Sequence, residues 1–427
     1  MKLFRFIPLL LIIISNSVLS QTVNDYGSNW PAWRGPLANG IAPESNPPVS
    51  WSESTSIKWR TAIPGKGFST PVIWDKYVFV STAIPRESVP GSATMPYTFK
   101  VLALNRADGK ILWEKTVADE EVQDRIHQTA SHVSSSPVTD GKFLYAYFGS
   151  RGLFCLDFKG NIIWKKDFGQ MQKRNNFGEG SSPALYGNKI VVQWDHEGQS
   201  EIFCVDKATG KDLWKKERDE PSSWSTPLIL EINGKVQVIT AASNKVRSYN
   251  LDNGDLIWEC SGLTGNVIPN AVFGDGILYV MSGYSGNALL AIRMADAKGD
   301  ISGSNAIIWS ANVNTPYVPS PLLVNKRLYF LRQNSGALSC LDAATGKIHY
   351  GTKMLENLGV VYNSPVYASG RIYQLGGTGL TYTLKDGPEM EIISENKLDD
   401  SFTASPAIAG DEIFLRGLKF VYCIAKD

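Results

Sequence analysis

Short runs of alternating apolar and polar residues follow one another along the chain, and the same order of runs recurs. Residues 143–148 show the pattern clearly, because aromatic and small side chains alternate there as in a strand with one buried face. Gly, Asp and Asn bound the runs, as in Asp140-Gly141 and Gly160-Asn161, and these residues favour tight turns. The pattern predicts short antiparallel strands, four to a repeat.

The repeat has a regular beginning and end. It begins at a proline and closes on an aromatic residue about every 40–55 residues, a spacing typical of β-propeller blades. The starts are Pro71, Pro137, Pro183, Pro227, Pro269, Pro321, Pro365 and Pro406. The closing aromatic residues are Trp113, Trp164, Trp214, Trp258, Trp309 and Tyr350. The starts predict an all-β fold, an eight-bladed β-propeller of four-stranded antiparallel blades.

The eighth repeat begins near Pro406 and ends without a closing strand. Residues 56–60 contain a strand-like run in which Trp59 stands where a closing tryptophan belongs. We predict that this N-terminal run completes the last blade. Pairing of the N- and C-terminal strands closes the ring and removes sheet edges that would otherwise template aggregation.

The N-terminus has the features of a secretory signal over residues 1–20: a basic start, an apolar stretch and small or aliphatic residues before Gln21. The apolar stretch is too short for a transmembrane segment, and no Cys follows it to carry a lipid anchor. We therefore expect a periplasmic or secreted protein. Residues 21–53 are predicted to form a Trp- and Pro-rich N-terminal extension, and residues 54–427 the propeller.

Composition and motifs restrict the function classes. The 427 residues carry a formal net charge of +1 and contain no basic stripe, so nucleic acid is not an expected partner. The sequence lacks the GxSxG nucleophile motif, the phosphate-binding Gly-Lys-Ser/Thr loop, the GxGxxG fingerprint and the CxxCH haem motif. Because the sequence contains none of these motifs, no catalytic signature supports an enzyme assignment.

The cysteines fit the repeat better than a disulfide framework. Cys155, Cys204, Cys340 and Cys423 occupy the same position near the end of the third strand, where other repeats have Ala, Ser or Thr. A position that takes only small residues belongs to a tight sheet interior, so we predict four buried free thiols. Cys260 follows Trp258 and has no predicted role.

Ligand-binding candidates lie in loops that depart from the repeat. Loops that start the blades and loops between second and third strands open on one face of a propeller, so their polar residues are expected to converge on a central funnel. The candidates are His127, His132, Arg151, His196, Trp224, Asn270, Tyr317, Arg332 and Asn363.

Each of these candidates also has a structural interpretation. His132 and His196 could form a proton-transfer pair or bind a metal, or each could cap a loop by bonding to backbone groups. Asp195, His196 and Glu197 look like a metal cluster, but adjacent loop residues point in different directions, so no metal site is predicted. Trp224 and Tyr317 could stack on a planar cofactor or a sugar, or fill gaps between blades.

The repeat phrase Ala/Cys-Leu-Asp-x-x-Thr-Gly-Lys-x-x-Trp resembles that of the PQQ-like (pyrroloquinoline-quinone) β-propeller repeat family. The opening NWPAWRGP at residues 29–36 is similar to the start of these proteins. Further similar motifs lie at residues 147–153, 194–198, 315–321 and 398–400. The resemblance covers essentially the whole predicted mature chain and implies the propeller fold.

The resemblance implies two kinds of function. Related quinoprotein dehydrogenases bind PQQ and calcium against an adjacent Cys-Cys disulfide, and this sequence has no Cys-Cys pair. The related B lipoproteins of the outer-membrane β-barrel assembly machinery act as scaffolds. The leading hypothesis is therefore a binding or scaffold protein with an unknown protein partner or a small-molecule ligand in the funnel. The alternatives are a PQQ-dependent oxidoreductase with a divergent site, and a carbohydrate-binding or polysaccharide-active protein.

Overall fold

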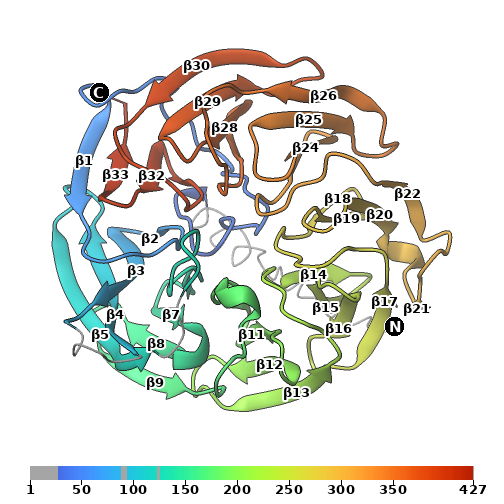
Figure 1. The fold of residues 1–427 in the computed structure, drawn as a ribbon, viewed down its shortest axis with the longest axis horizontal. Helices are drawn as coiled ribbons and strands as arrows, with labels where there is room; N and C mark the ends of the chain where they lie inside the picture. The colour runs from blue at the N-terminus through green and yellow to red at the C-terminus, as the bar shows by residue number, and fades with distance from the viewer. Residues whose placement is uncertain (1–26, 88–93, 123–125, 427) are drawn as a thin grey trace, which may run out of the picture.

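Eight sheets surround a central axis in the computed structural model, which describes residues 27–87, 94–122 and 126–426 (Figure 1). Each sheet has four antiparallel strands in consecutive order, apart from one added strand and the joint between the termini. The predicted eight-bladed β-propeller is confirmed. The signal predicted at residues 1–20 lies outside the described residues. Within the described part of the chain, no helix has the length and apolar character needed to cross a membrane.

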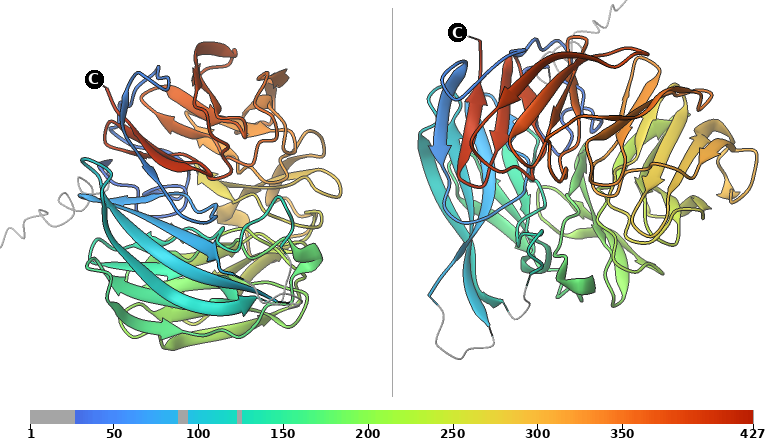
Figure 2. Two further views of the ribbon diagram at one scale, coloured as in Figure 1. Left: turned by 60° about the vertical axis from the view of Figure 1, so that its left-hand side comes forward. Right: turned by 45° about the horizontal axis from the view of Figure 1, so that its top comes forward.

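The blades follow the chain order around the ring. Blade 1 comprises β2 (Val72–Trp74), β3 (Tyr77–Pro85), β4 (Met95–Asn105) and β5 (Ile111–Val122), and blade 2 comprises β6 (Val138–Thr139), β7 (Phe143–Tyr147), β8 (Leu153–Asp157) and β9 (Ile162–Lys166). Blade 3 comprises β10 (Ala184–Tyr186), β11 (Lys189–Trp194), β12 (Ser200–Asp206) and β13 (Asp212–Arg218), and blade 4 comprises β14 (Leu228–Ile232), β15 (Lys235–Thr240), β16 (Val246–Asn250) and β17 (Leu256–Cys260). Blade 5 comprises β18 (Val272–Gly274), β19 (Ile277–Ser282), β20 (Ala288–Arg293) and β22 (Ile307–Ala311), and blade 6 comprises β23 (Leu322–Val324), β24 (Arg327–Leu331), β25 (Ala337–Asp342) and β26 (Ile348–Met354). Blade 7 comprises β27 (Val366–Ala368), β28 (Arg371–Leu375), β29 (Leu380–Lys385) and β30 (Glu391–Lys397), and blade 8 comprises β31 (Ala407–Ala409), β32 (Glu412–Arg416), β33 (Phe420–Ile424) and β1 (Ile57–Ala62). In blade 1, β3, β4 and β5 are long and project beyond the ring on one side (Figure 2).

The ring closes between the two ends of the chain, as predicted. Strand β1 pairs antiparallel with β33, and Trp59 lies opposite Cys423 in the register. The eighth blade therefore contains three C-terminal strands and one N-terminal strand. Because β33 pairs with β32 on one side and with β1 on the other, the C-terminal strand has no unpaired edge among the described residues.

Closing tryptophans join neighbouring blades at five of the eight boundaries. In five blades the indole Nε1 donates a hydrogen bond to a main-chain carbonyl in the turn before the outer strand of the following blade. The pairs are Trp59 with Arg106 (2.9 Å), Trp113 with Phe158 (2.9 Å), Trp164 with Lys207 (3.1 Å), Trp214 with Leu251 (2.8 Å) and Trp309 with Ala343 (3.0 Å). The ring then lies against a glycine of that turn. At Gly210 (φ 70°), an added Cβ would lie only 2.6 Å from the Trp164 ring, so this position requires glycine.

Blade 5 departs from this arrangement. Its turn between β20 and β22 is lengthened and contains β21 (Gly299–Asp300), which pairs in parallel with β17 of blade 4. Trp258 of β17 lies opposite Gly299 and is buried, and its Nε1 has no hydrogen-bond partner among the described residues. The insertion therefore covers the tryptophan that the other blades place against a glycine turn.

All five cysteines are buried and free. The four at the shared third-strand position confirm the sequence prediction, and Cys260 joins them at the end of β17. Burial raises the pKa of Cys155 and Cys204 to about 12, and that of Cys260 and Cys340 to about 11. The thiols are therefore protonated packing residues rather than nucleophiles.

The described part of the N-terminal extension reaches the middle of the ring. Trp30 exchanges two backbone hydrogen bonds with Ile73 in blade 1 (2.9 and 3.0 Å). The fully buried guanidinium of Arg34 then donates to the carbonyls of Pro321 (2.6 Å) and Pro365 (2.8 Å) in blades 6 and 7. Further along, Trp51 stacks on Tyr373 of blade 7. The extension thus ties the inner parts of blades 1, 6 and 7 together.

Candidate functional site: an aromatic cavity on the propeller axis

A closed cycle of inter-blade hydrogen bonds surrounds the channel; we call it the collar. In seven of the eight blades, the residue at the start of the inner strand donates its backbone N–H to the side-chain oxygen of its counterpart in the next blade. The successive residues are Thr70, Ser136, Ser182, Thr226, Asn270, Ser320, Ser364 and Ser405, with donor–acceptor distances of 2.9–3.0 Å. The Thr70 hydroxyl completes the cycle by donating to the carbonyl of Ser405 (3.2 Å).

The collar corrects the start assigned to blade 5. The sequence pattern places that start at Pro269, but Asn270 occupies the collar position and Ala271 stands where the other blades have proline. The Asn270 side chain replaces a hydroxyl here, and its Oδ1 accepts the N–H of Thr226 (3.0 Å). Pro269 stands one residue before the collar position, so it resembles the start of a repeat in the sequence but lies out of register with the other starts.

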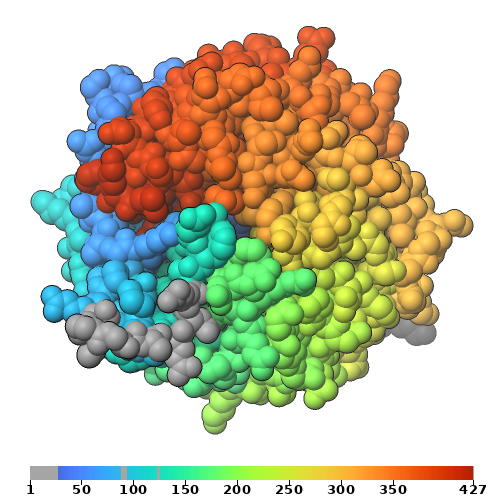
Figure 3. Space-filling view, in the orientation of Figure 1, coloured from blue at the N-terminus to red at the C-terminus, as the bar shows by residue number. Residues whose placement is uncertain are grey.

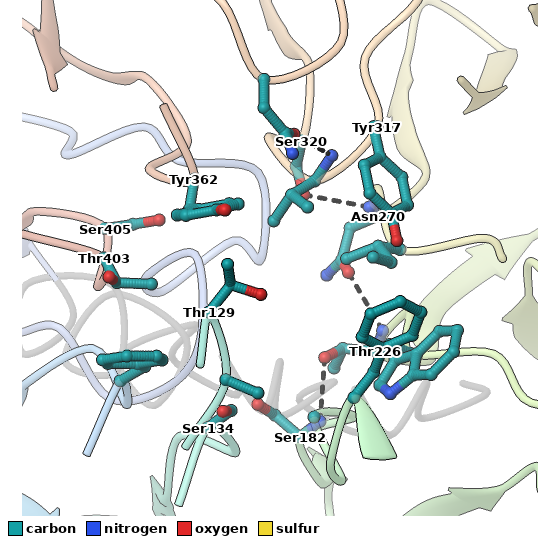
Figure 4. A pocket seen from close by; sticks show the side chains of 18 of the residues that line it. Thr129, Ser134, Ser182, Thr226, Asn270, Tyr317, Ser320, Tyr362, Thr403 and Ser405 are labelled. Atoms are coloured by element: carbon teal, nitrogen blue, oxygen red, sulfur yellow. Dashed lines mark hydrogen bonds between the residues drawn. The ribbon is translucent and has the colours of Figure 1, made fainter. Parts of the chain in front are cut away.

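A cavity of about 420 Å³ lies on the axis and receives residues from all eight blades and from the extension. Ser and Thr hydroxyls and the Asn270 amide project into it (Figure 4). Its aromatic residues are Trp33, Phe68, Phe177, Trp224, Tyr284, Tyr317 and Tyr362. Trp33 comes from the segment that Arg34 anchors, so the extension contributes to the wall. Loops of blades 2 and 3, teal and green, crowd the centre of the face in Figure 3.

The cavity has little charge. Glu179 is its one carboxylate, and among the described residues its lining contains neither Lys nor Arg. That carboxylate is already engaged, because Ser150 donates to it through its backbone N–H (2.8 Å) and its hydroxyl (2.5 Å). Arg151 and Lys173 each lie 3.5 Å from it, away from the cavity lining. The walls therefore present aromatic faces and neutral hydrogen-bonding groups.

Four of the nine candidate residues line this cavity: His127, Trp224, Asn270 and Tyr317. The His127 ring hydrogen-bonds to Thr129 (2.8 Å), and Trp224 Nε1 donates to the carbonyl of Gly178 (2.9 Å). Burial raises the pKa of Tyr317, so its phenol stays neutral. Their role in binding a ligand stays a prediction.

The other five candidates lie elsewhere. His132 packs on Tyr97 (ring centroids 4.5 Å apart) and shares a small recess with Arg151, whose guanidinium lies over Phe99. His196 accepts backbone N–H bonds at Nδ1, and Arg332 is exposed. Asn363 is fully buried, and its amide donates to the carbonyl of Ala404. Burial lowers the pKa of His196, which favours its neutral form.

The sequence cluster of Asp195, His196 and Glu197 does not converge. Asp195 forms a fully buried ion pair with Arg218 (2.7 Å), whereas Glu197 accepts the N–H of Ser222 (3.1 Å). Across the described ranges, no three His, Cys, Asp or Glu residues are grouped so as to hold a metal ion.

PQQ and calcium do not fit the cavity. PQQ is a planar tricarboxylate, and anion recognition in proteins relies on Arg, Lys or clustered backbone amides. Calcium takes about six to eight oxygen ligands, with carboxylates prominent among them. The cavity offers one carboxylate, which Ser150 already engages, and its described lining has no cationic side chain.

Sequence reasoning missed most of the cavity wall. The collar residues carry a visible signal, because seven of them are Ser or Thr followed by proline, two residues before the inner strand begins. Trp33 and Tyr362 carried no such signal, because only the folded ring brings the extension and the blade 7 loop to the axis.

Comparison with known proteins gives a family and two kinds of relative. A family model described as outer membrane protein assembly factor BamB matches residues 98–350. The outer membrane protein assembly factor BamB of Francisella salina is 23% identical over 170 residues, 40% of this chain and 30% of that protein. Tetrathionate hydrolase of Acidithiobacillus ferrooxidans is 21% identical over 292 residues, 64% of this chain and 53% of that protein. The chain thus spans less than two thirds of either relative.

Solved structures share the fold at low identity. BamB from Moraxella catarrhalis superposes with a TM-score of 0.59 at 13% identity, covering 86% of this chain and 99% of that one. Quinohemoprotein alcohol dehydrogenase from Comamonas testosteroni gives 0.66 at 10% identity, covering 96% and 82%. Because the family model matches more than half of the residues, the chain belongs to the PQQ-like β-propeller family described as outer membrane protein assembly factor BamB.

Proposed function

We propose that the protein is an exported binding protein that holds a small, ring-containing molecule in its axial cavity and has no catalytic activity of its own. The observation that carries this proposal is the 420 Å³ cavity with seven aromatic side chains and neutral polar groups. Small-molecule sites commonly enclose about 300–1,000 Å³ and combine apolar walls with a few placed polar groups. The location follows from the secretory signal predicted at residues 1–20.

A scaffold role is the second candidate, and the family supports it. The matching family model is named for an outer-membrane assembly factor. A scaffold would present the rim loops to a protein partner and would not need an aromatic cavity. Variants can separate ligand binding from partner binding, because the cavity residues lie on the axis whereas a partner would contact the rim loops.

The oxidoreductase alternative lacks support from the side chains. Its cofactor would require cationic partners, and the described residues of the cavity wall include none. Added PQQ and calcium are therefore expected to give no spectral shift and no dye-linked oxidation of alcohols or sugars. Turnover in that assay would overturn the non-catalytic assignment.

The binding proposal is tested by calorimetric titration of the purified chain with methyl glycosides, disaccharides and small aromatic alcohols. At least one probe is expected to bind, and Trp224→Ala is expected to weaken it by about fivefold or more, as loss of a stacking ring worth about 1 kcal/mol or more implies. Tyr186→Ala is the matched control, since Tyr186 is an exposed aromatic residue outside the cavity. Absence of binding by every probe would overturn the proposal.

A further inference from the structure

We infer that the cavity-lining residues of the collar also bind the ligand, and that this ligand is an uncharged sugar ring. The inference rests on the proposed binding function and specifies its ligand class. Five collar residues line the cavity: Ser182, Thr226, Asn270, Ser320 and Ser405. They come from blades 3, 4, 5, 6 and 8, so their polar groups face one space from several directions (Figure 4).

The hydrogen-bond pattern leaves these side chains as donors. A hydroxyl has one O–H donor and two acceptor lone pairs. The Ser182 oxygen accepts the N–H of Ser136 (2.9 Å), and the Thr226 oxygen accepts that of Ser182 (3.0 Å). Their hydroxyl hydrogens, like those of Ser320 and Ser405, have no acceptor among the described residues. The collar therefore offers O–H donors to the cavity.

Asn270 follows the same rule through its amide. Its Oδ1 accepts the N–H of Thr226 (3.0 Å), which assigns the orientation of the side chain. The NH2 group then faces away from that bond and provides two further donors. No described residue accepts a hydrogen bond from it. The collar is thus a set of neutral donors suited to a ligand rich in acceptor oxygens.

The charges around the cavity favour a neutral ligand over an ionic one. A carboxylate ligand would find no Lys or Arg in the described wall and would lie near Glu179. A cationic ligand would meet donors on the collar, and the Glu179 carboxylate already accepts two hydrogen bonds from Ser150 and lies 3.5 Å from both Arg151 and Lys173. Sugar rings have acceptor oxygens on their edges and apolar C–H faces, which match the donors and the aromatic walls, respectively.

The collar itself supplies the control for this inference. Ser136 and Ser364 accept the same inter-blade N–H bond at the same 2.9 Å, but they do not line the cavity. Alanine at Ser182 or Ser320 removes one inter-blade acceptor and one ligand donor. Alanine at Ser136 or Ser364 removes only the inter-blade acceptor.

The probes are methyl glucoside, methyl galactoside and methyl mannoside, each with its uronate and amino-sugar counterpart, titrated by calorimetry. At least one neutral glycoside is expected to bind about tenfold more tightly than its charged counterparts. Ser182→Ala and Ser320→Ala should each weaken it by about fivefold, the size expected for one hydrogen bond. Ser136→Ala and Ser364→Ala should lower the melting temperature similarly but leave binding unchanged. At Thr226, Val should weaken binding and Ser should preserve it.

The outcomes separate this inference from the proposed function. Equal binding by all four alanine variants would show that the collar is only structural, and tighter binding of a uronate or amino sugar would overturn the ligand class. In either case, a loss of binding in Trp224→Ala would leave the cavity-binding proposal standing. Failure of every sugar to bind, with binding of an aromatic alcohol, would overturn this inference alone, and failure of the aromatic alcohols as well would overturn both. If Ser182→Ala does not fold, Ser320→Ala and the Thr226 pair give the same comparison.

Discussion

The indole Nε1 of Trp59 donates a 2.9 Å hydrogen bond to the main-chain carbonyl of Arg106, which joins the eighth blade to the first. Trp59 belongs to the N-terminal strand of blade 8, so this contact and the β1–β33 ladder together close the ring. The same tryptophan-to-turn contact recurs at four other blade boundaries. Ring closure therefore uses the ordinary inter-blade contact.

Replacing Trp59 by Ala should destabilise the whole propeller. Large buried aromatic residues cost about 3–5 kcal/mol when truncated to Ala, and Trp59 is 7% exposed. Urea unfolding followed by tryptophan fluorescence measures the change. The exposed Leu112→Ala in an outer strand of blade 1 is the control and should stay within about 0.5 kcal/mol of the wild type. Similar stability of the two variants would contradict the role given to Trp59.

Gly210→Ala should cost more than Gly234→Ala. Both glycines have similar positive φ (70° and 73°), where an L-residue costs about 1–2 kcal/mol. Only Gly210 lies against a tryptophan ring, and no atom lies within 4 Å of a Cβ placed at Gly234. The difference between the two unfolding free energies therefore reports the clash with Trp164. Equal costs would show that the ring moves aside freely.

The five thiols should resist alkylation in the folded protein. They are buried, and burial raises the pKa of Cys155 to about 12, which leaves almost no reactive thiolate at neutral pH. Mass spectrometry after iodoacetamide at pH 8 should find no modified cysteine in the native chain and five in urea. Modification of any thiol under native conditions would contradict the packing described for it.

Acid should weaken the contact between blades 6 and 7 at Asp386. Burial acts to raise the pKa of this carboxyl, but hydrogen bonds from Arg327, Asn325 and Tyr329 outweigh it and hold the pKa below its usual value. A lowered carboxyl pKa contributes stability above the unfolded pKa of about 4, and that stability is lost as the pH falls through the folded pKa.

Urea unfolding at pH 7 and pH 3 tests this contribution. Asp386→Asn should lower the unfolding free energy at pH 7 by about 1–3 kcal/mol, as expected for hydrogen bonds to a charged group. Its loss of stability between pH 7 and pH 3 should be smaller than that of the wild type. Asp399→Asn, at a side chain that is 94% exposed, should behave like the wild type. An unchanged pH dependence in Asp386→Asn would refute the argument.

The local sequence pattern was sufficient to predict the propeller fold because each blade repeats the same short pattern of strands and turns. The alternation of side chains, the turns and the closing tryptophans predicted the number of blades and the completion of the last blade by the strand that contains Trp59. The cysteine position was readable for the same reason. Pattern failed at Pro269, where a proline stands one residue before the collar position and only the hydrogen bonds of Asn270 reveal the register.

The candidate site was less accessible to sequence reasoning. Loop polarity predicted Trp224, Asn270 and Tyr317, which line the cavity, but it predicted His196 and Asn363 in the same way, and these two do not line it. Those two side chains bond to backbone groups instead, because His196 Nδ1 accepts the N–H of Gly198 and the Asn363 amide donates to the carbonyl of Ala404. Position in a loop determines which face of the disc a residue is near, whereas side-chain direction depends on neighbouring blades.

The sequence by itself determined the repeat, the eight blades, the closure by the termini and the small-residue position of the buried thiols. These features depend on contacts within a blade or between adjacent blades, which recur and therefore leave a periodic trace. Only the tertiary structure decided the cavity. The collar positions carry a Ser/Thr-Pro repeat, but the aromatic wall does not. Trp33 reaches the axis because the ring closes and Arg34 anchors the extension across it, and such contacts from non-repeating segments leave no periodic trace in the chain.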